Sequence, residues 1–265
     1  MRNLQMSVSI AALMLVLLVN VFVSGQDKLT PLQRQIEQQK QRLTSGEAEE
    51  RRDALMKLGA IKHVDASRAA VTSLSDPEPM VRVTAAHAIT SLPGPDAVRA
   101  LVPLLKDKLE FVRREAAYAL GEAGDKSGVQ PLVEVLDTEK EISVRAASAA
   151  ALGQIQDESA VPALARVLSG ISPNRKSKKR EDDFVMRCAA QALGQIRSRA
   201  GVEILVSALT NEKNSVDVRR AAAEALGLIG DPAAIPALRA ALNSTDPYLS
   251  ETSRESLRRL HVSKN

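Results

Sequence analysis

The hydrophobic positions of the chain recur in a nine-residue pattern, written VRREAAYAL at residues 112–120. Within this stretch the apolar residues stand at i, i+4, i+5, i+7 and i+8, so they share one face of an α-helix. The pattern returns at intervals of 31 to 41 residues, and each copy carries leucine or isoleucine eight positions after its start. The seven copies start at Glu50, Val81, Val112, Val144, Val185, Val218 and Leu249. This spacing predicts seven equivalent helices.

A second apolar segment lies between successive copies, as in AVPALARVL at residues 160–168. Its apolar residues also have helical spacing. Its last leucine recurs at Leu43, Leu74, Leu105, Leu136, Leu168, Leu209 and Leu242. The runs GEAGD at 121–125 and GLIGD at 227–231 indicate breaks between the two segments, because glycine commonly ends a helix and aspartate caps the next one. Each repeating unit is therefore predicted to be a pair of helices.

A two-helix unit of about 31 residues cannot bury its apolar face alone, so copies must stack to form a continuous core. Aromatic residues make up only 2% of the chain and tryptophan is absent, whereas alanine and leucine, both good helix formers, dominate the repeats. The small alanines allow neighbouring helices to approach closely. We predict an all-α protein, an α-solenoid (superhelix) of about seven helical pairs over residues 28–261. The helix that begins at each pattern copy is expected to line the concave side.

The first 25 residues have a different character from the rest. Arg2 is their only charge, an apolar run extends over residues 10–23, and small residues follow at Ser24 and Gly25. This arrangement is typical of a secretory signal peptide, with a short N-terminal anchor as the alternative. Residues 1–25 are therefore expected to be a signal peptide or anchor, and residues 26–265 a single solenoid outside the cytoplasm, periplasmic or extracellular. With Cys188 as its only cysteine, the chain can form no internal disulfide.

Residues 107–136, DKLEFVRREAAYALGEAGDKSGVQPLVEVL, resemble the HEAT-like repeat named after the phycobilisome (PBS) bilin lyases. The resemblance extends over nearly all of the chain after the first 25 residues. It implies an armadillo-like helical superhelix in which the arginine after the leading valine pairs with an aspartate of the same or the adjacent repeat. The arginines at this place are Arg51, Arg82, Arg113, Arg145 and Arg219, and the aspartates at the matching turns are Asp76 and Asp107. We interpret this set as a structural ladder.

The same resemblance raises two enzymatic alternatives, a bilin lyase and the metal hydroxylase deoxyhypusine hydroxylase, an oxidoreductase that holds two irons through His-Glu pairs. None of the three histidines, His63, His87 and His261, is followed by glutamate. Arginines at the third pattern position are interleaved with acids, whereas nucleic-acid binding favours an unopposed basic stripe. Cys188 lies three repeats from His87, too far for a nucleophile and its base. No catalytic residue, cofactor, metal or nucleic-acid partner is therefore expected.

The remaining hypothesis is a surface that binds a protein or peptide partner on the concave side. Aromatic residues flanked by arginine are typical of binding hot spots, which singles out Tyr118. The candidate residues are His87, Arg114, Tyr118, Glu122, Gln191, Arg220 and Glu224. A charged insertion at 170–183 accounts for the one long interval. It is either a passive flexible loop or a contact for an acidic partner or anionic membrane head groups through Arg175, Lys176, Lys178, Lys179 and Arg180.

Overall fold

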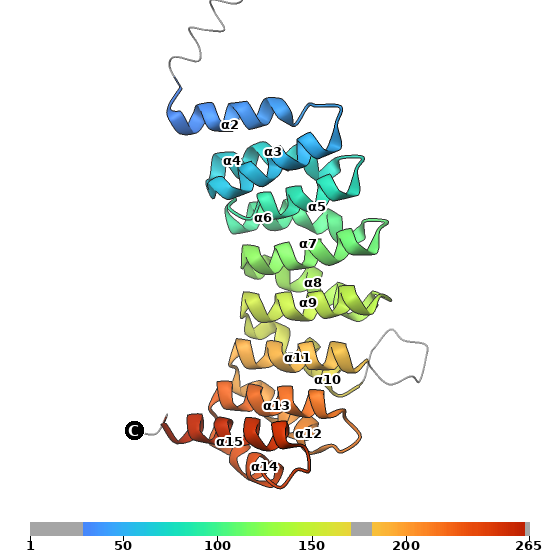
Figure 1. Cartoon of the computed structure of the whole chain (residues 1–265). Helices are drawn as coiled ribbons and strands as arrows, with labels where there is room; N and C mark the ends of the chain where they lie inside the picture. Colours follow the sequence, from blue (N-terminus) through green and yellow to red (C-terminus); the bar gives the residue numbers. More distant parts are fainter. Residues whose placement is uncertain (1–28, 171–181, 263–265) are drawn as a thin grey trace, which may run out of the picture.

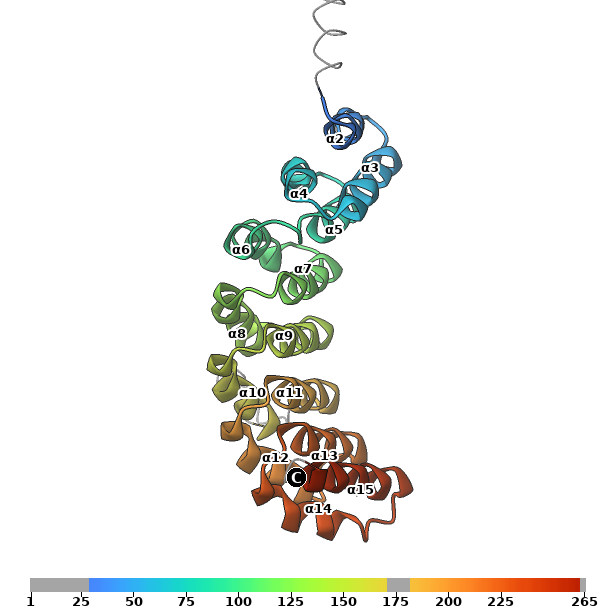
Figure 2. The same cartoon turned by 90° about the vertical axis from the view of Figure 1, so that its left-hand side faces the viewer.

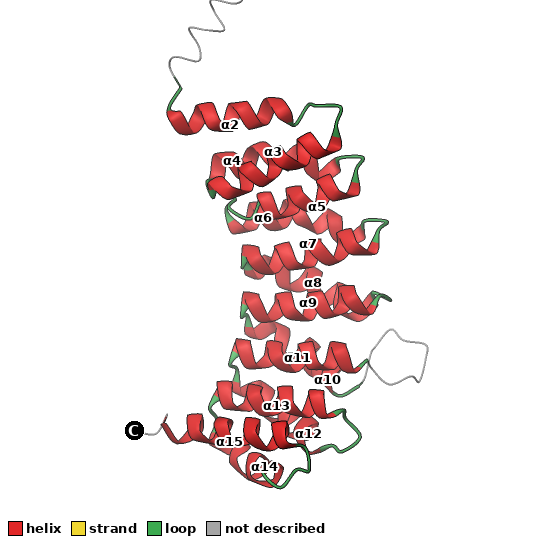
Figure 3. Cartoon of the chain, viewed as in Figure 1, coloured by secondary structure: helices red, strands yellow, loops and turns green. Residues whose placement is uncertain are grey.

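The computed structural model describes residues 29–170 and 182–262, and within these ranges every regular element is a helix (Figure 3). Seven helices begin near the seven copies of the nine-residue pattern, and we call them the inner helices. They are α3 (Ala48–Ile61), α5 (Pro79–Ala88), α7 (Glu110–Ala123), α9 (Ile142–Ile155), α11 (Asp183–Ile196), α13 (Val216–Ile229) and α15 (Pro247–Val262).

The second apolar segment forms the outer helices. They are α2 (Pro31–Arg42), α4 (Val64–Ala70), α6 (Gly94–Leu101), α8 (Val129–Thr138), α10 (Val161–Leu168), α12 (Val202–Thr210) and α14 (Ile235–Ala241). Short 3₁₀ turns extend them: η1 (Val71–Ser75) and η2 (Val102–Lys106) follow α4 and α6, while η3 (Lys126–Gly128), η4 (Glu158–Ala160), η5 (Arg199–Gly201) and η6 (Pro232–Ala234) precede α8, α10, α12 and α14. The predicted all-α solenoid of seven helical pairs is confirmed for the described residues.

The pairs stack in chain order from α2 at one end to α15 at the other (Figure 1). Viewed along the helices, the inner and outer helices form two columns, and the stack bends so that the inner column lies on the inside of the curve (Figure 2). Consecutive inner helices pack extensively against one another, whereas consecutive outer helices touch only slightly. The inner helices therefore line the concave side.

The aliphatic core runs without interruption through the stack. Fully buried leucines recur at the last pattern position, as at Leu58, Leu120, Leu152 and Leu226, and alanines fill the contacts between inner helices. Because each pair contacts only its neighbours, this core is a row of similar interfaces rather than one central cluster.

The turns between helices follow the expected cap chemistry. Aspartate side chains accept a hydrogen bond from the backbone two residues further on, at Asp125, Asp157 and Asp231. Gly124 and Gly230 end their helices in the left-handed region, with φ of +67° and +75°. In other repeats Lys62, Gln156 and Arg197 take this conformation without being glycine.

The structure corrects the interpretation of the first glycine in each GEAGD-type run. Gly121 and Gly227 lie inside α7 and α13, not between helices. At the equivalent place in α11, a Cβ added to Gly194 would lie 2.8 Å from the Cα and 2.9 Å from the Cβ of Ala225. Interiors are packed too densely to absorb such an atom, so the inner helices approach this closely only because the position has no side chain.

Replacing Gly194 by alanine is expected to lower the free energy of unfolding by about 1–3 kcal/mol, the usual cost of overpacking. Helix propensity alone predicts the opposite sign, since alanine is better than glycine inside a helix by about 1 kcal/mol. Urea unfolding followed by circular dichroism measures the difference. Gly46→Ala is the control, because no atom lies within 4 Å of a Cβ placed there. A stabilised Gly194→Ala protein would contradict the close helix approach.

The ladder arginines join each repeat to the next one. Arg51 donates to both carboxylate oxygens of Asp76, at 2.7 and 2.8 Å, and to the backbone carbonyls of Ser45 and Gly46 in its own turn. Arg82 makes the same contacts one repeat later, with Asp107 at 2.8 and 3.1 Å. Each guanidinium thus ties its own turn to the carboxylate of the following repeat.

The ladder changes its partners further along the stack. Arg113 pairs with Glu139 at 2.7 Å, where the resemblance implied an aspartate. The Nε atoms of Arg145 and Arg219 donate to the backbone carbonyls of Leu136 and Leu209, both at 2.9 Å. Arg51, Arg82 and Arg113 therefore connect neighbouring repeats, whereas these bonds of Arg145 and Arg219 go to the preceding outer helix of their own repeat.

Two predicted segments fall wholly or mainly outside the described residues. The signal peptide or anchor at 1–25 and the basic residues Arg175, Lys176, Lys178, Lys179 and Arg180 lie there. The insertion was expected to extend to Asp183, which is wrong by two residues. Asp182 caps α11 by accepting from the backbone of Phe184, and Asp183 is the first helical residue. Among the described helices, none combines the length and apolar character needed to cross a membrane.

Candidate functional site

The concave surface is formed by one face of each inner helix. In the five central inner helices, α5, α7, α9, α11 and α13, pattern positions 1, 5, 6, 8 and 9 are buried between helices, so positions 3, 4, 7 and 11 lie on the opposite face of the helix. We number the first pattern residue 1 throughout. On α7 these outward positions hold Arg114, Glu115, Tyr118 and Glu122, with Tyr118 and Glu122 exposed. We call the resulting surface the concave face.

The predicted residues fall into two groups on this face. His87 of α5 and Arg114, Tyr118 and Glu122 of α7 lie on adjacent helices. Gln191 of α11 is exposed, as is Glu224 of α13, and Arg220 of α13 pairs with Asp217 at 2.6 Å. Helix α9 separates the two groups, so the structure does not bring the predicted residues into one cluster.

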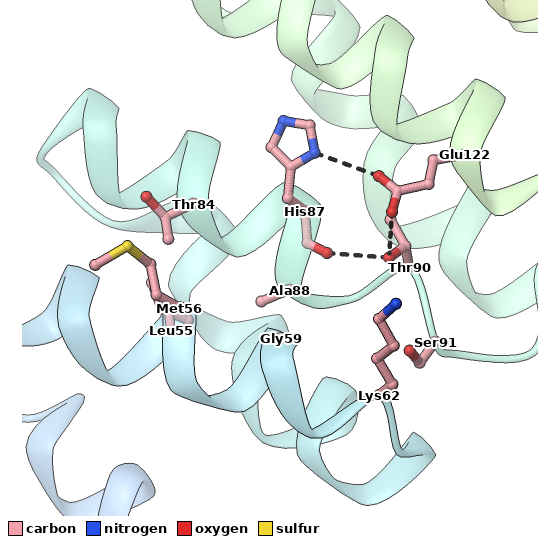
Figure 4. A pocket seen from close by; sticks show the side chains of 10 residues that line it. All are labelled: Leu55, Met56, Gly59, Lys62, Thr84, His87, Ala88, Thr90, Ser91 and Glu122. Atoms are coloured by element: carbon pink, nitrogen blue, oxygen red, sulfur yellow. Dashed lines mark hydrogen bonds and ion pairs between the residues drawn. The ribbon is translucent and has the colours of Figure 1, made fainter.

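His87 and Glu122 of the first group meet across the junction of α5 and α7 (Figure 4). The two ring nitrogens of His87 each lie 3.4 Å from a carboxylate oxygen, Nδ1 from Glu122 and Nε2 from Glu115. The Thr90 hydroxyl donates to Glu122 at 3.3 Å, and Arg114 pairs with Glu115 at 3.0 Å. We call this set the α5–α7 polar bridge.

The polar bridge occupies the place where the repeats pack least closely. Position 10 of the pattern is glycine in α3, α7, α9, α11 and α13, but it is Thr90 after α5. Helix α5 ends at Ala88, and it packs against α7 less extensively than α7 packs against α9. A pocket of about 440 Å³ opens beside this junction, lined by Met56, Lys62 and His87 among others. Its side chains reach it from α3, α5 and α7 (Figure 4).

The polar bridge contains residue types that are found in catalytic sites, but these residues are not arranged as a nucleophile with its base or as a metal site. A nucleophile needs a hydrogen bond to its base, and His87 contacts two carboxylates rather than a hydroxyl or thiol. Glu115 and Glu122 lie at opposite ring nitrogens, so His87 and both carboxylates cannot bind one metal ion. No three His, Cys, Asp or Glu side chains of the described chain are grouped for metal binding. The sequence shows no His-Glu pair, yet folding brings two glutamates to one histidine.

Cys188 lies on the same face, at position 4 of α11, and is half-buried. Burial raises the pKa of its thiol above the ordinary value, with the nearby Arg187 acting in the opposite direction. The thiolate is therefore a small fraction at neutral pH, and Cys188 is not activated as a nucleophile.

One position on the concave face was not predicted from the sequence: the residue immediately before the pattern. It stands seven places before position 7, so it shares the concave face, and helical spacing alone could have identified it. This position holds Met80, Phe111, Phe184 and Tyr248 in α5, α7, α11 and α15. Phe111, Phe184 and Tyr248, together with Tyr118, are all the phenylalanine and tyrosine residues of the described chain.

The concave aromatics are exposed although the protein has few of them. Tyr248 is 68% exposed, Phe184 43% and Tyr118 36%, and Met56 is 56% exposed on α3. Two of them lie beside arginine: the guanidinium of Arg187 is 5.0 Å from the ring centre of Phe184, and that of Arg220 is 5.5 Å from Tyr248. Aromatic, methionine and arginine side chains are the types enriched at protein interfaces.

Comparison with known proteins agrees with the observed repeats. A family model described as HEAT repeats matches residues 36–121, 110–177 and 177–258. Among solved structures, the complex of CpcE and CpcF of phycocyanin lyase from Nostoc sp. PCC7120 is 25% identical with a TM-score of 0.52, and the match covers 90% of this chain and 89% of that one. An engineered protein is also 25% identical, with a TM-score of 0.51 and coverage of 85% and 68%.

Human deoxyhypusine hydroxylase in complex with glycerol is 23% identical with a TM-score of 0.45, over 86% of this chain and 84% of that one, a likeness that says nothing of activity. The search of curated proteins found no match. The three family-model matches cover almost the whole described solenoid, and they agree with its paired helices. The chain belongs to the HEAT-repeat family.

Proposed function

We propose that this protein is a non-enzymatic scaffold that binds a protein or peptide partner on its concave face, outside the cytoplasm. The observation that carries the proposal is the distribution of aromatic residues. A folded chain normally places its aromatics in the core, where they bury the largest apolar area. Here the core is aliphatic: Tyr118, Phe184 and Tyr248 are exposed on the concave face, and only Phe111 is half-buried against the core.

Two further observations support this reading. The exposed apolar side chains alternate with arginines, a combination typical of binding hot spots. The phycocyanin lyase structure, similar in fold, is a complex of two chains, CpcE and CpcF, which supports a protein partner for this solenoid as well. The proposed location rests on residues 1–25, whose apolar run and small flanking residues are those of an export signal.

The double variant Tyr118→Ala with Arg114→Ala is expected to abolish capture of the native partner while leaving the fold intact. Both side chains lie on the concave face rather than between repeats, so their loss removes contact area without opening the core. The measurement is a pull-down from the envelope fraction of the native cell with mass spectrometry, and circular dichroism checks the fold.

The control variant carries Arg68→Ala with Arg99→Ala, two exposed residues on the outer helices α4 and α6. It should retain capture. Equal recovery of the partner by wild type and by the concave double variant would contradict the proposal. Stoichiometric iron in the purified protein would favour the enzymatic alternative instead.

A further inference from the structure

The arginines of the concave face are, with one exception, neutralised by a carboxylate of their own helix. In α3, α7 and α13 an arginine stands at position 3 of the pattern. The pairs are Arg52 with Glu49 at 2.7 Å, Arg114 with Glu115 at 3.0 Å and Arg220 with Asp217 at 2.6 Å. Such pairs leave little net charge for a ligand to recognise.

Arg187 of α11 is the exception. The residue three places before it is Phe184, where α3 and α13 have an acid. Within the described chain its guanidinium makes no ion pair, and its buried Nε has no hydrogen-bond partner. Its contact is with the ring of Phe184, 5.0 Å away. Arg187 is therefore a half-buried cation that, unlike Arg52 and Arg220, lacks a carboxylate partner in the described chain, whereas the unsatisfied Nε is common to all three.

No acid on the neighbouring inner helices forms an ion pair with Arg187 within the described chain. On the side of α9, the corresponding positions hold Ser143, Ala146, Ala147 and Ala150, which are small and uncharged, and Ala146 and Ala147 are buried. On the side of α13, Asp217 is engaged by Arg220, and the exposed Glu224 forms no ion pair with Arg187. A buried polar group without a partner costs free energy, and the cost is larger for a charged group. This cost is removed when a ligand supplies the missing acceptor.

We propose that Arg187 and Phe184 form an anchor for an acidic segment of the partner, in which an Asp or Glu lies next to an apolar residue. The carboxylate accepts paired hydrogen bonds from the guanidinium, and the apolar side chain packs on the exposed ring of Phe184. The ring holds the guanidinium in place before binding, which reduces the entropy lost on association. This inference rests on the proposed scaffold function and adds the chemistry of the partner.

The position of the anchor favours a peptide over a membrane. Arg187 belongs to α11, the fifth of the seven described inner helices, and these helices lie on the inside of the curve of the stack (Figure 2). A flat bilayer cannot follow a concave surface, whereas an extended chain can lie along it.

The test uses the full-length protein and a displayed library of random twelve-residue peptides as the probe. Peptides selected by wild type are expected to be enriched in an acidic residue adjacent to an apolar one. Arg187→Gln should weaken binding of a selected peptide by at least about tenfold, as expected for loss of a charge-assisted hydrogen bond. Arg187→Lys keeps the charge without the paired geometry and should restore part of the affinity. Arg99→Gln, which changes an exposed arginine of the outer helix α6 that pairs with Asp96, is the control.

Several outcomes would overturn the anchor. These are peptides without acidic enrichment, no selected peptide at all, or equal loss in Arg187→Gln and Arg99→Gln. Binding of the protein to phosphatidylglycerol vesicles that depends on Arg187 would assign the residue to lipid and also reject the peptide. If non-acidic peptides bind and are lost in the Tyr118→Ala and Arg114→Ala variant, the scaffold function stands and only the anchor fails.

Discussion

Replacing Arg82 by alanine is expected to cost about 3 kcal/mol of folding free energy, near the lower end for breaking a buried ion pair. Arg82 and Asp107 are only 9% and 10% exposed at their side chains, and the guanidinium also donates to the carbonyl oxygens of Asp76 and Pro77. The variant leaves the Asp107 carboxylate buried without its cation and frees two turn carbonyls. Urea unfolding at neutral pH measures the loss.

The matched control is Arg99→Ala, because Arg99 forms an exposed pair with Asp96 in which the two side chains are 79% and 51% accessible. Exposed pairs contribute little, so this change should cost less than about 1 kcal/mol. If both variants lose the same stability, the ladder is not a structural element.

The loss in Arg82→Ala should also depend on pH. Burial raises the pKa of Asp107, but the hydrogen bonds from Arg82 and from the Leu109 backbone lower it more, and the net pKa lies below the ordinary value. A carboxylate with a lowered folded-state pKa stabilises the protein above its unfolded pKa of about 3.9, and this stabilisation disappears as the pH falls through the folded value. The gap between wild type and Arg82→Ala should therefore narrow below about pH 4.

Leu226→Ala is the second substitution with a large expected effect, about 2–5 kcal/mol. Leu226 is fully buried at the last pattern position of α13, so its removal opens a cavity between stacked helices. Leu228→Ala, in the same helix but only half-buried, is the control and should cost far less. Chemical unfolding monitored by circular dichroism compares the two variants. Similar unfolding midpoints for both would show that Leu226 is not the buried residue of this helix.

The helical pairs, their order and the concave side could be predicted because each depends on residues close together in sequence. The spacing of Val112, Ala116 and Leu120 defines a helix face, and repetition of that face defines a stack. The first glycine of GEAGD was misinterpreted for a related reason. Gly121 has its function in a contact with Ala151 of the next repeat, and a pattern within one repeat contains no sign of that contact.

The candidate site was predicted less completely than the fold. Position 7 pointed to His87 and Tyr118, and their placement on the concave face follows from helical periodicity. The contacts of His87 with Glu115 and Glu122 depend instead on how far apart α5 and α7 lie, which is a property of two repeats together. That Arg187 forms no ion pair in the described chain likewise cannot be read from the sequence, because it depends on where the acidic side chains of the neighbouring helices lie in the folded protein.

Thr90 gives the stack an uneven stiffness. Where glycine stands at this position, backbone meets backbone, and such a joint resists both bending and extension. At Thr90 the joint is bridged by His87 and Glu122 side chains, which can rotate and exchange partners with water. We therefore expect the described solenoid to behave as a short stiff arm from α2 to α5 and a longer stiff arm from α7 to α15, connected by a more flexible joint where the packing is least extensive. Under a pulling force the chain should yield first between α5 and α7, well before the glycine joints open.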